Sequence, residues 1–208
     1  MAGKKRLLIM AGLYFIILLF VVTYFTCNLV DKIAVTSFKK LYSAYTQALY
    51  TTVYQMDGDT GCYFSSDKRI KSDFSRCDSF YKKFATNLRV NKYCKIEAFA
   101  DGCIPIYENY AKTAPCAGFS ESMMNKFNQA FVMNDNTNII VFNLPANVQK
   151  PLFAVDSNGK LFPNRAGYDL FSMVIMRNKY GNYYFHPNVT YCLPVDKGGI
   201  KDIRDVYK

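Results

Sequence analysis

The sequence contains no tryptophan and a single histidine, His186. It also lacks a serine–histidine–aspartate pattern, a glycine-rich phosphate loop and a metalloprotease helix, so the common catalytic signatures are excluded. The seven cysteines include no Cys-x-x-Cys pair, which argues against zinc. The aromatic residues are all tyrosine and phenylalanine, a composition that favours sheet and packed helix over disorder. We therefore predict a folded protein that is not an enzyme.

Charge is absent from the segment Leu7–Thr26, LLIMAGLYFIILLFVVTYFT. As a helix it would be about 30 Å long, the thickness of the hydrocarbon core of a bilayer. Lys4, Lys5 and Arg6 precede it, which predicts a cytoplasmic N-terminus. No small-residue cleavage site follows, so an uncleaved signal-anchor is favoured over a signal peptide. The predicted organisation is a cytoplasmic tip (1–6), a single transmembrane anchor (7–27) and an exported domain (28–208).

The cysteines agree with export. Cys27 is at the membrane edge, and six others follow it in the predicted exported domain, an even number that indicates three disulfides in an oxidising compartment. The sequence allows 15 pairings of six cysteines. We favour the local pairs Cys62–Cys77 and Cys94–Cys103, with Cys116–Cys192 as the third.

Neither proline nor glycine occurs between Asn28 and Met56. Apolar residues recur there every three or four positions, which predicts that the membrane helix continues as an amphipathic helix ending at Asp57-Gly58-Asp59. A second helix is predicted over Ser72–Val90, with Ser72 as its N-cap. The face of the first helix expected to pack on the domain consists of Phe38, Leu41, Tyr45, Ala48 and Leu49.

Short apolar segments separated by Asn, Asp and Gly turns predict an antiparallel meander in the C-terminal half. The stretch Asn91–Ser120 is expected to be irregular, and a short helix is expected to begin at Ser120. The fold class is therefore α+β, a long N-terminal helix against an antiparallel sheet. The predicted strands are Gln129–Met133, Asn138–Leu144, Pro151–Val155, Leu170–Arg177 and Tyr183–His186.

The best candidate site lies between two of these strands, in Asp156-Ser157-Asn158-Gly159. Asp156, Asn158 and Asp169 supply hard oxygen ligands of the kind that calcium prefers, although two carboxylates are few for a tight site. The alternative is a structural turn in which Asp156 and Asn158 bond local backbone and Gly159 has a positive φ. We favour the turn and keep calcium as the alternative; no other cofactor is expected.

Two segments resemble type IV pilins and the pseudopilins of type II secretion. NLVDKIAVTSFKKLYSAYTQALYTTV (Asn28–Val53) is similar to their post-membrane helix, and VDSNGKLFPNRAGYDLFSMVI to a strand region near their C-terminus. The resemblance covers Asn28–Val53 and Gln129–Phe185, and it implies a pilin-like fold in the inner membrane. Some major pseudopilins carry calcium in a C-terminal loop, which makes the calcium alternative relevant here.

The chain departs from the family pattern at three places. Lys5-Arg6 stands where the prepilin peptidase would cut, Met10 where the family has a glutamate, and Cys27 where a proline is expected. In the family the glutamate is thought to pair with the N-terminal amine of a neighbouring subunit, since an unpaired charge in the membrane is costly. These departures favour a pilin-like domain retained on its own anchor.

Two functions are compatible with this sequence. The first is a non-catalytic pilin-like or minor pseudopilin-like envelope protein in filament assembly, secretion or DNA uptake, with the membrane and other pilin-like or secretion-system subunits as partners. The second is a membrane-tethered binding or sensory domain that does not enter a filament. The net charge of +10 would suit nucleic acid, but it is spread along the chain and predicts a solvated surface instead.

Overall fold

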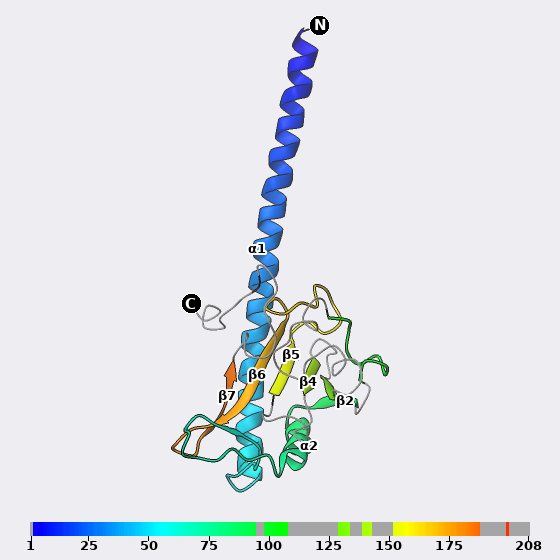
Figure 1. The fold of residues 1–208 in the computed structure, drawn as a ribbon. Helices are drawn as coiled ribbons and strands as arrows, with labels where there is room; N and C mark the ends of the chain where they lie inside the picture. The colour runs from blue at the N-terminus through cyan, green and yellow to red at the C-terminus, as the bar shows by residue number, and fades with distance from the viewer. Residues whose placement is uncertain are drawn as a thin grey trace. The chain divides into compact units, whose positions relative to one another are not determined.

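A computed structural model describes residues 2–94, 98–107, 129–133, 139–142, 152–187 and 199, without the side chains of 2–9, 27–35, 139–142, 152 and 187. The chain divides into two compact units, Met1–Thr36 and Ser37–Lys208. Helix α1 (Ala2–Gln55) contributes residues to both units. The described residues have the predicted α+β fold class, with two helices and seven strands (Figure 1).

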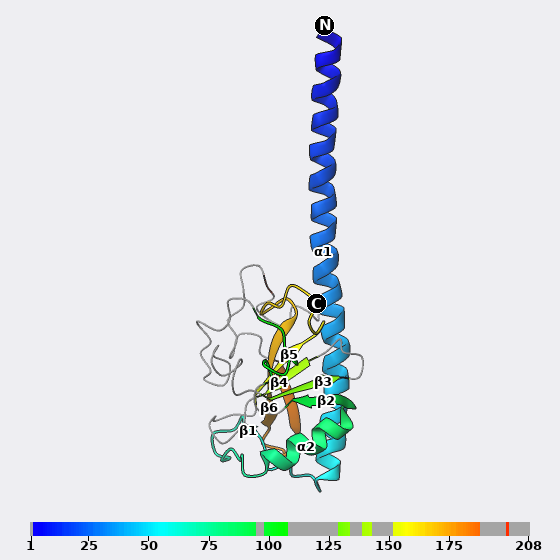
Figure 2. The same cartoon turned by 90° about the vertical axis from the view of Figure 1, so that its right-hand side faces the viewer.

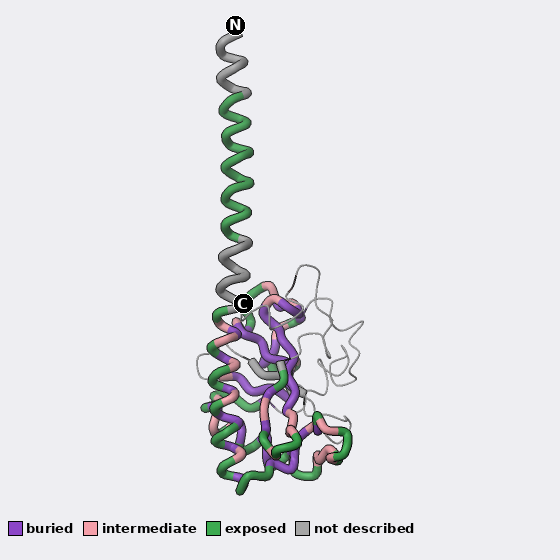
Figure 3. The backbone as a smooth tube through the Cα atoms, turned by 90° about the vertical axis from the view of Figure 1, so that its left-hand side faces the viewer, coloured by how far each residue is buried: buried purple, intermediate pink, exposed green. Residues whose placement is uncertain are grey.

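In the first unit, every described side chain from residue 10 to residue 26 is exposed (Figure 3). Most of these side chains are large and apolar, including Phe15, Phe20 and Phe25. Within the part of the chain whose side chains are described, no helix has both the length and the apolar character needed to cross a membrane. The predicted anchor begins with residues 7–9, whose side chains lie outside the described ones, so it stays a prediction.

In the second unit, the last part of α1 buries one face. All five residues of the predicted packing face are buried, and Phe38, Tyr45 and Leu49 are at most 1% exposed. The helix ends where Asp57 and Gly58 take φ angles of 55° and 80°. The Gly58 amide then donates to the Val53 carbonyl oxygen at 2.9 Å, satisfying one of the last carbonyls of the helix.

The sheet has the order β1-β6-β5-β4-β3-β2, and β7 pairs with the remaining edge of β6. The five strands predicted from the sequence are β3 to β7, with ends within two residues of the expected ones. Sequential antiparallel neighbours join β2 through β7. The strands are β1 (Phe64–Ser65), β2 (Val90–Cys94), β3 (Gln129–Met133), β4 (Ile139–Phe142), β5 (Leu152–Asp156), β6 (Leu170–Arg177) and β7 (Tyr183–Pro187).

The sheet is mixed, which corrects the prediction of a purely antiparallel one. Strand β1 runs parallel to β6, with Phe64 opposite Met176 and Ser65 opposite Arg177. Strand β5 pairs with β6 only as far as Val174, so β1 continues the same edge of β6 beyond the end of β5. A strand of two residues carries no alternation of apolar and polar positions, and for this reason the sequence did not reveal it.

Side chains alternate between the two faces of the sheet, and each face has its own core. On one face, phenylalanines of the sheet meet the helices: the ring centroids of Phe38 and Phe171 are 4.5 Å apart, and those of Phe84 and Phe185 are 5.7 Å apart. The other face is covered by residues 98–107. Its buried cluster contains Cys94, Ala98, Cys103, Ile104, Tyr107, Ala130, Val132, Ala154, Ala166, Leu170 and Val174.

Helix α2 (Cys77–Asn87) is shorter at both ends than the predicted helix Ser72–Val90 (Figure 2). Ser72 is not its N-cap, because the Ser72 hydroxyl instead accepts a hydrogen bond from the Ser65 amide of β1 at 3.1 Å. At the other end, Arg89 takes a φ of 55°, and Val90 begins β2. The apolar face of the helix is nevertheless buried, with Phe80, Tyr81 and Phe84 at most 2% exposed.

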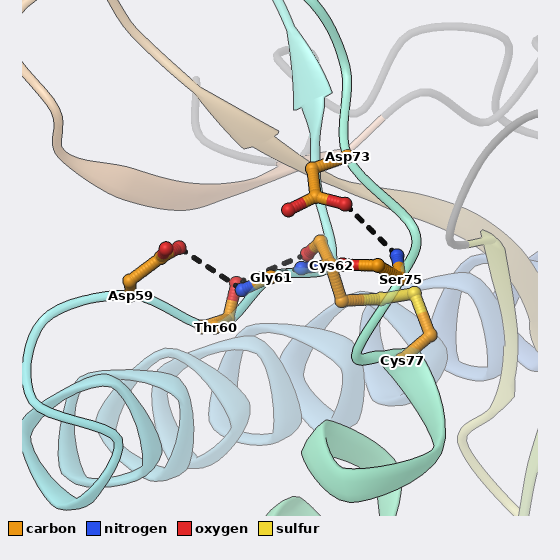
Figure 4. The surroundings of a disulfide bond; sticks show 7 residues. All are labelled: Asp59, Thr60, Gly61, Cys62, Asp73, Ser75 and Cys77. Atoms are coloured by element: carbon orange, nitrogen blue, oxygen red, sulfur yellow. Dashed lines mark hydrogen bonds between the residues drawn. A yellow bond between two sulfur atoms is a disulfide. The ribbon is translucent and has the colours of Figure 1, made fainter.

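The prediction of disulfide bonds is confirmed for the two local pairs. Cys62–Cys77 joins the segment after α1 to the first residue of α2, next to Asp73, whose Oδ1 accepts the Ser75 amide (Figure 4). Cys94–Cys103 joins the end of β2 to the segment that covers the sheet. Both bonds are almost fully buried. The third predicted pair, Cys116–Cys192, and the predicted helix at Ser120 lie outside the described residues.

Strand β2 occupies part of a stretch that we expected to be irregular, Asn91–Ser120. Asn91, Lys92 and Tyr93 are all exposed, so this edge strand lacks the apolar alternation on which a sequence prediction relies. Pairing with β3 shifts its register between Val90 and Lys92, which disturbs the pattern further.

Candidate cation-binding loop

The three residues of the candidate site lie on one loop. Strand β5 ends at Asp156 and β6 begins at Leu170, and these two residues are paired across the ladder. The loop between them is closed by the Ser157 amide, which donates to the Asp169 carbonyl oxygen at 2.9 Å. Figure 1 draws this loop in yellow, beyond the paired ends of β5 and β6. The sheet register thus brings Asp156 and Asp169 close together although they are distant in sequence.

The first half of the loop is the turn that the sequence predicted. Asp156 Oδ1 accepts the backbone amide of Asn158 at 3.1 Å, an Asx turn in which the side chain replaces a backbone acceptor. The side-chain amide of Asn158 donates to the Phe162 carbonyl oxygen at 3.1 Å. Gly159 has a φ of 69°, the left-handed conformation that the turn requires.

The second half of the loop is organised by Asp169. Its two carboxylate oxygens accept the amides of Asn164 and Arg165, at 2.6 Å and 2.7 Å. Asn164 takes a φ of 51°, and the Arg165 carbonyl oxygen accepts three later amides of the loop, including that of Leu170. The hydrogen bonds of the Asp169 carboxylate therefore fix the backbone of the second half of the loop.

Both carboxyl groups have raised pKa values. Asp156 is fully buried, and the loss of hydration raises its pKa well above the ordinary range; the nearby charge of Asp169 raises it further. The Asn158 amide and the Tyr107 hydroxyl lower the pKa of Asp156 and so oppose part of this rise. Burial also raises the pKa of Asp169, and the Arg165 and Asn164 amides oppose this shift. Two buried carboxyl groups side by side favour either a shared proton or a bound cation.

Three buried oxygens of the loop accept no hydrogen bond of normal geometry within the described part of the chain: Asp156 Oδ2, Asn158 Oδ1 and Asn164 Oδ1. Buried polar atoms normally have partners, so such oxygens call for water, a proton or an ion. One carboxylate and two amide oxygens are ligand types that calcium prefers. The described residues contain no group of three or more His, Cys, Asp or Glu side chains that could hold a metal. Of the three buried oxygens, one belongs to a carboxylate and two belong to amides, so a calcium ion bound here would have mostly uncharged ligands.

Comparison with known proteins identifies no relative. No family model, curated protein or solved structure matches this chain.

Sequence reasoning found Asp156, Asn158 and Asp169 but missed the contributions of Asn164 and Tyr107. In the sequence Asn164 follows Pro163 and shows no pattern typical of a ligand, whereas in the fold its buried amide oxygen belongs to the same loop as Asp156. Tyr107 comes from an irregular segment that is distant in sequence, so nothing in the local sequence pattern indicates that it lies near Asp156. Lys160 also contacts that segment, since its Nζ donates to the Gly102 carbonyl oxygen.

Proposed function

We propose that this chain is a non-catalytic, pilin-like envelope protein, held by its N-terminal helix in the inner membrane and carrying an exported domain. The observation that carries the proposal is the exposure of every described side chain from residue 10 to residue 26, none of them charged. A helix that is apolar on all sides needs an apolar environment on all sides, and a bilayer supplies one. Lys4, Lys5 and Arg6 place the short N-terminal side in the cytoplasm.

The second unit supports export. Its two buried disulfides suit an oxidising compartment, and a reducing cytoplasm would oppose them. A helix packed on a largely antiparallel sheet, with an Asp-x-Asn-Gly loop between β5 and β6, is the arrangement that the resemblance to pilins implies. The proposed role is that of a pilin-like or minor pseudopilin-like subunit in filament assembly, secretion or DNA uptake.

One sequence observation favours a second candidate function. Met10 replaces the glutamate, and Lys5-Arg6 replaces the cleavage site, on which filament entry depends in the family. A chain without either would remain in the membrane as a tethered binding or sensory domain. The two candidates share the anchor and the fold, and they differ in whether the N-terminus is processed.

Mass spectrometry of the purified N-terminus, combined with membrane fractionation, tests both points. We expect an intact N-terminus, and a chain that stays in the membrane pellet after alkaline extraction. Replacing Leu18, in the middle of the exposed segment, with Lys should weaken retention in the membrane pellet, since a charge at the bilayer centre costs about 3 kcal/mol. A mature chain beginning near Leu7 would instead support the filament subunit. A wild-type chain found in the soluble fraction would overturn the anchor.

We also propose that the β5–β6 loop binds calcium. This is supported by the buried oxygens of Asp156, Asn158 and Asn164 and by the raised pKa values of both carboxyl groups. A calcium ion would offset the repulsion between Asp156 and Asp169 and satisfy oxygens that burial has removed from water. Titration calorimetry with calcium on the purified chain tests this directly. An absence of binding at millimolar calcium would leave the turn as the sole role of the loop.

A further inference from the structure

The described part of the second unit exposes few purely apolar side chains, and those few lie on two loops. Among its described residues, the exposed large hydrophobic side chains are four tyrosines and three others: Ile106, Leu161 and Phe162. Their exposed fractions are 72%, 68% and 82%. Tyrosine carries a hydroxyl that water can solvate, whereas Ile, Leu and Phe do not. We call Ile106, Leu161 and Phe162 the apolar tip.

The two loops of the apolar tip are adjacent. Lys160 Nζ donates to the Gly102 carbonyl oxygen, which ties the β5–β6 loop to the segment 98–107. The Tyr107 hydroxyl is close enough to the carboxylate of Asp156, at the base of the same loop, to lower its pKa. Ile106 precedes Tyr107, and Leu161 follows Lys160, so each exposed side chain is next to a residue that joins the loops.

The apolar tip lies at the end of the second unit where the chain enters it. The unit begins at Ser37, and the ring of Phe38 is 4.5 Å from the ring of Phe171, the second residue of β6. The β5–β6 loop ends immediately before that strand. The opposite end of the unit carries the β6–β7 turn, where Tyr180 is 76% exposed. The tip and the entering helix therefore share one end of the sheet, and Tyr180 marks the other end.

Ten residues, 27–36, separate the exposed apolar segment of the first unit from Ser37, the first residue of the second unit.

We propose that the apolar tip inserts into the headgroup region of the membrane that holds the anchor; this inference rests on the proposed anchor. Apolar side chains accompanied by lysines on one surface are the composition of segments that lie in a membrane interface. Lys40 is exposed two residues after Phe38, whose ring contacts that of Phe171 at the same end of β6, and Lys160 is on the loop itself. Their positive charge suits the phosphates of anionic lipids.

The absence of tryptophan makes the test direct, because a single introduced tryptophan is a unique fluorescent reporter. The full chain carrying Phe162→Trp is reconstituted into vesicles of phosphatidylcholine and phosphatidylglycerol whose acyl chains are brominated near the headgroup. The matched control carries Tyr180→Trp, at the opposite end of the unit and similarly exposed. We expect blue-shifted emission and at least twofold quenching for Phe162→Trp, and water-like, unquenched emission for Tyr180→Trp. Leu161→Trp should behave like Phe162→Trp.

Flotation of the vesicles separates the two proposals. If the chain floats with the vesicles but Phe162→Trp and Leu161→Trp are unquenched, the tip does not enter lipid and this inference is overturned while the anchor stands. Blue-shifted emission without quenching overturns it as well, because it places the tip against protein, such as a second copy of the chain. If the chain does not float, the anchor fails and the inference fails with it.

Discussion

The hydroxyl of Tyr183 donates a hydrogen bond to Asp59 Oδ1 at 2.7 Å, joining the edge strand β7 to the segment that follows α1. Arg177 lies over the rings of both Tyr183 and Tyr63, 5.3 Å and 5.2 Å from their centroids. The hydrogen bond from Tyr183 and that from the Gly61 amide lower the pKa of Asp59. The same contact with Asp59, together with burial as the larger cause, raises the pKa of Tyr183 to about 12.

This contact predicts a pH dependence of stability. Because the pKa of Asp59 is lowered on folding, its contribution is present above the ordinary carboxyl pKa of about 3.9 and is lost as pH falls toward the lowered value. Tyr183→Phe removes the hydroxyl, so it should lower the melting temperature at pH 7 and have a smaller effect at pH 3. Melting curves of both chains across this range give the difference. A difference that does not change with pH would contradict a role for the Asp59 charge.

Leu41→Asp should unfold the second unit. Leu41 is 9% exposed on the packing face of α1, and an unpaired charge there costs several kcal/mol. Gln47→Asp is the matched control, because Gln47 is exposed on the same helix. Circular dichroism on heating should show a large loss of stability for Leu41→Asp and a small one for Gln47→Asp. Equal melting of the two variants would mean that the Leu41 face is not a core contact.

The variant Asp156→Asn tests whether the β5–β6 loop binds calcium or is only a structural turn. Because the pKa of Asp156 is raised on folding, its ionisation destabilises the folded state as pH rises above the ordinary carboxyl value. Removing the charge should therefore raise the melting temperature at pH 7 in chelator. With calcium, the wild-type chain should gain stability as the concentration exceeds the dissociation constant, and Asp156→Asn should lose most of that gain.

Thermal melts of both chains, with calcium and with chelator, give four values that decide between the two roles. A wild-type melting temperature that is unaffected by calcium would reject the cation site. A lower stability of Asp156→Asn in chelator would show that the carboxylate is needed for the turn itself.

Gly159→Ala should lower stability by about 1 kcal/mol, since its φ of 69° is strained for residues with a Cβ. Gly159→Asn is the informative comparison, because asparagine tolerates the left-handed region better than alanine. Denaturant unfolding should place the asparagine variant between alanine and wild type. A neutral alanine variant would indicate that the turn relaxes at little cost.

Non-reducing peptide mapping should find Cys62 linked to Cys77 and Cys94 linked to Cys103. We further expect Cys116 linked to Cys192, the pair left by this pattern. Replacing Cys62 and Cys77 together with serine should cost about 3 kcal/mol, as estimated for closing a loop of their separation, 15 residues. Free thiols at Cys116 and Cys192 would refute the third bond.

The sequence predicts those parts of the fold in which a local pattern carries the information. The spacing from Phe38 to Leu49 marks one side of a helix, and all five of its residues are buried. The sequence predicts strand β6 at its observed ends because a largely apolar run lies between two turns. The two local disulfides can be predicted for the same reason, since the paired cysteines are only 15 and 9 residues apart in sequence.

The features that were missed depend on contacts distant in sequence. Serine is a good N-cap residue, but the Ser72 hydroxyl accepts a hydrogen bond from the Ser65 amide instead. Local sequence patterns do not predict such a contact. Strand β1 exists because Arg177 and Met176 lie opposite it in the folded chain. In the candidate loop, the Asx turn was visible, whereas the buried oxygen of Asn164 and the approach of Tyr107 appear only after the strands have paired.

The Tyr42 hydroxyl on α1 donates to the Phe185 carbonyl oxygen of β7 at 2.9 Å. An edge strand ordinarily offers such carbonyls to any extended chain that arrives, and this is how sheets of different molecules fuse into aggregates. At Phe185 a strand added to this edge would first have to displace a side chain of the protein's own helix. At the other end of the described sheet, β2 presents the exposed Lys92, a charge that an incoming strand would have to accommodate. The two ends of the described sheet are thus protected from self-association by different means: one by a hydrogen bond from the protein's own helix, the other by a charged side chain.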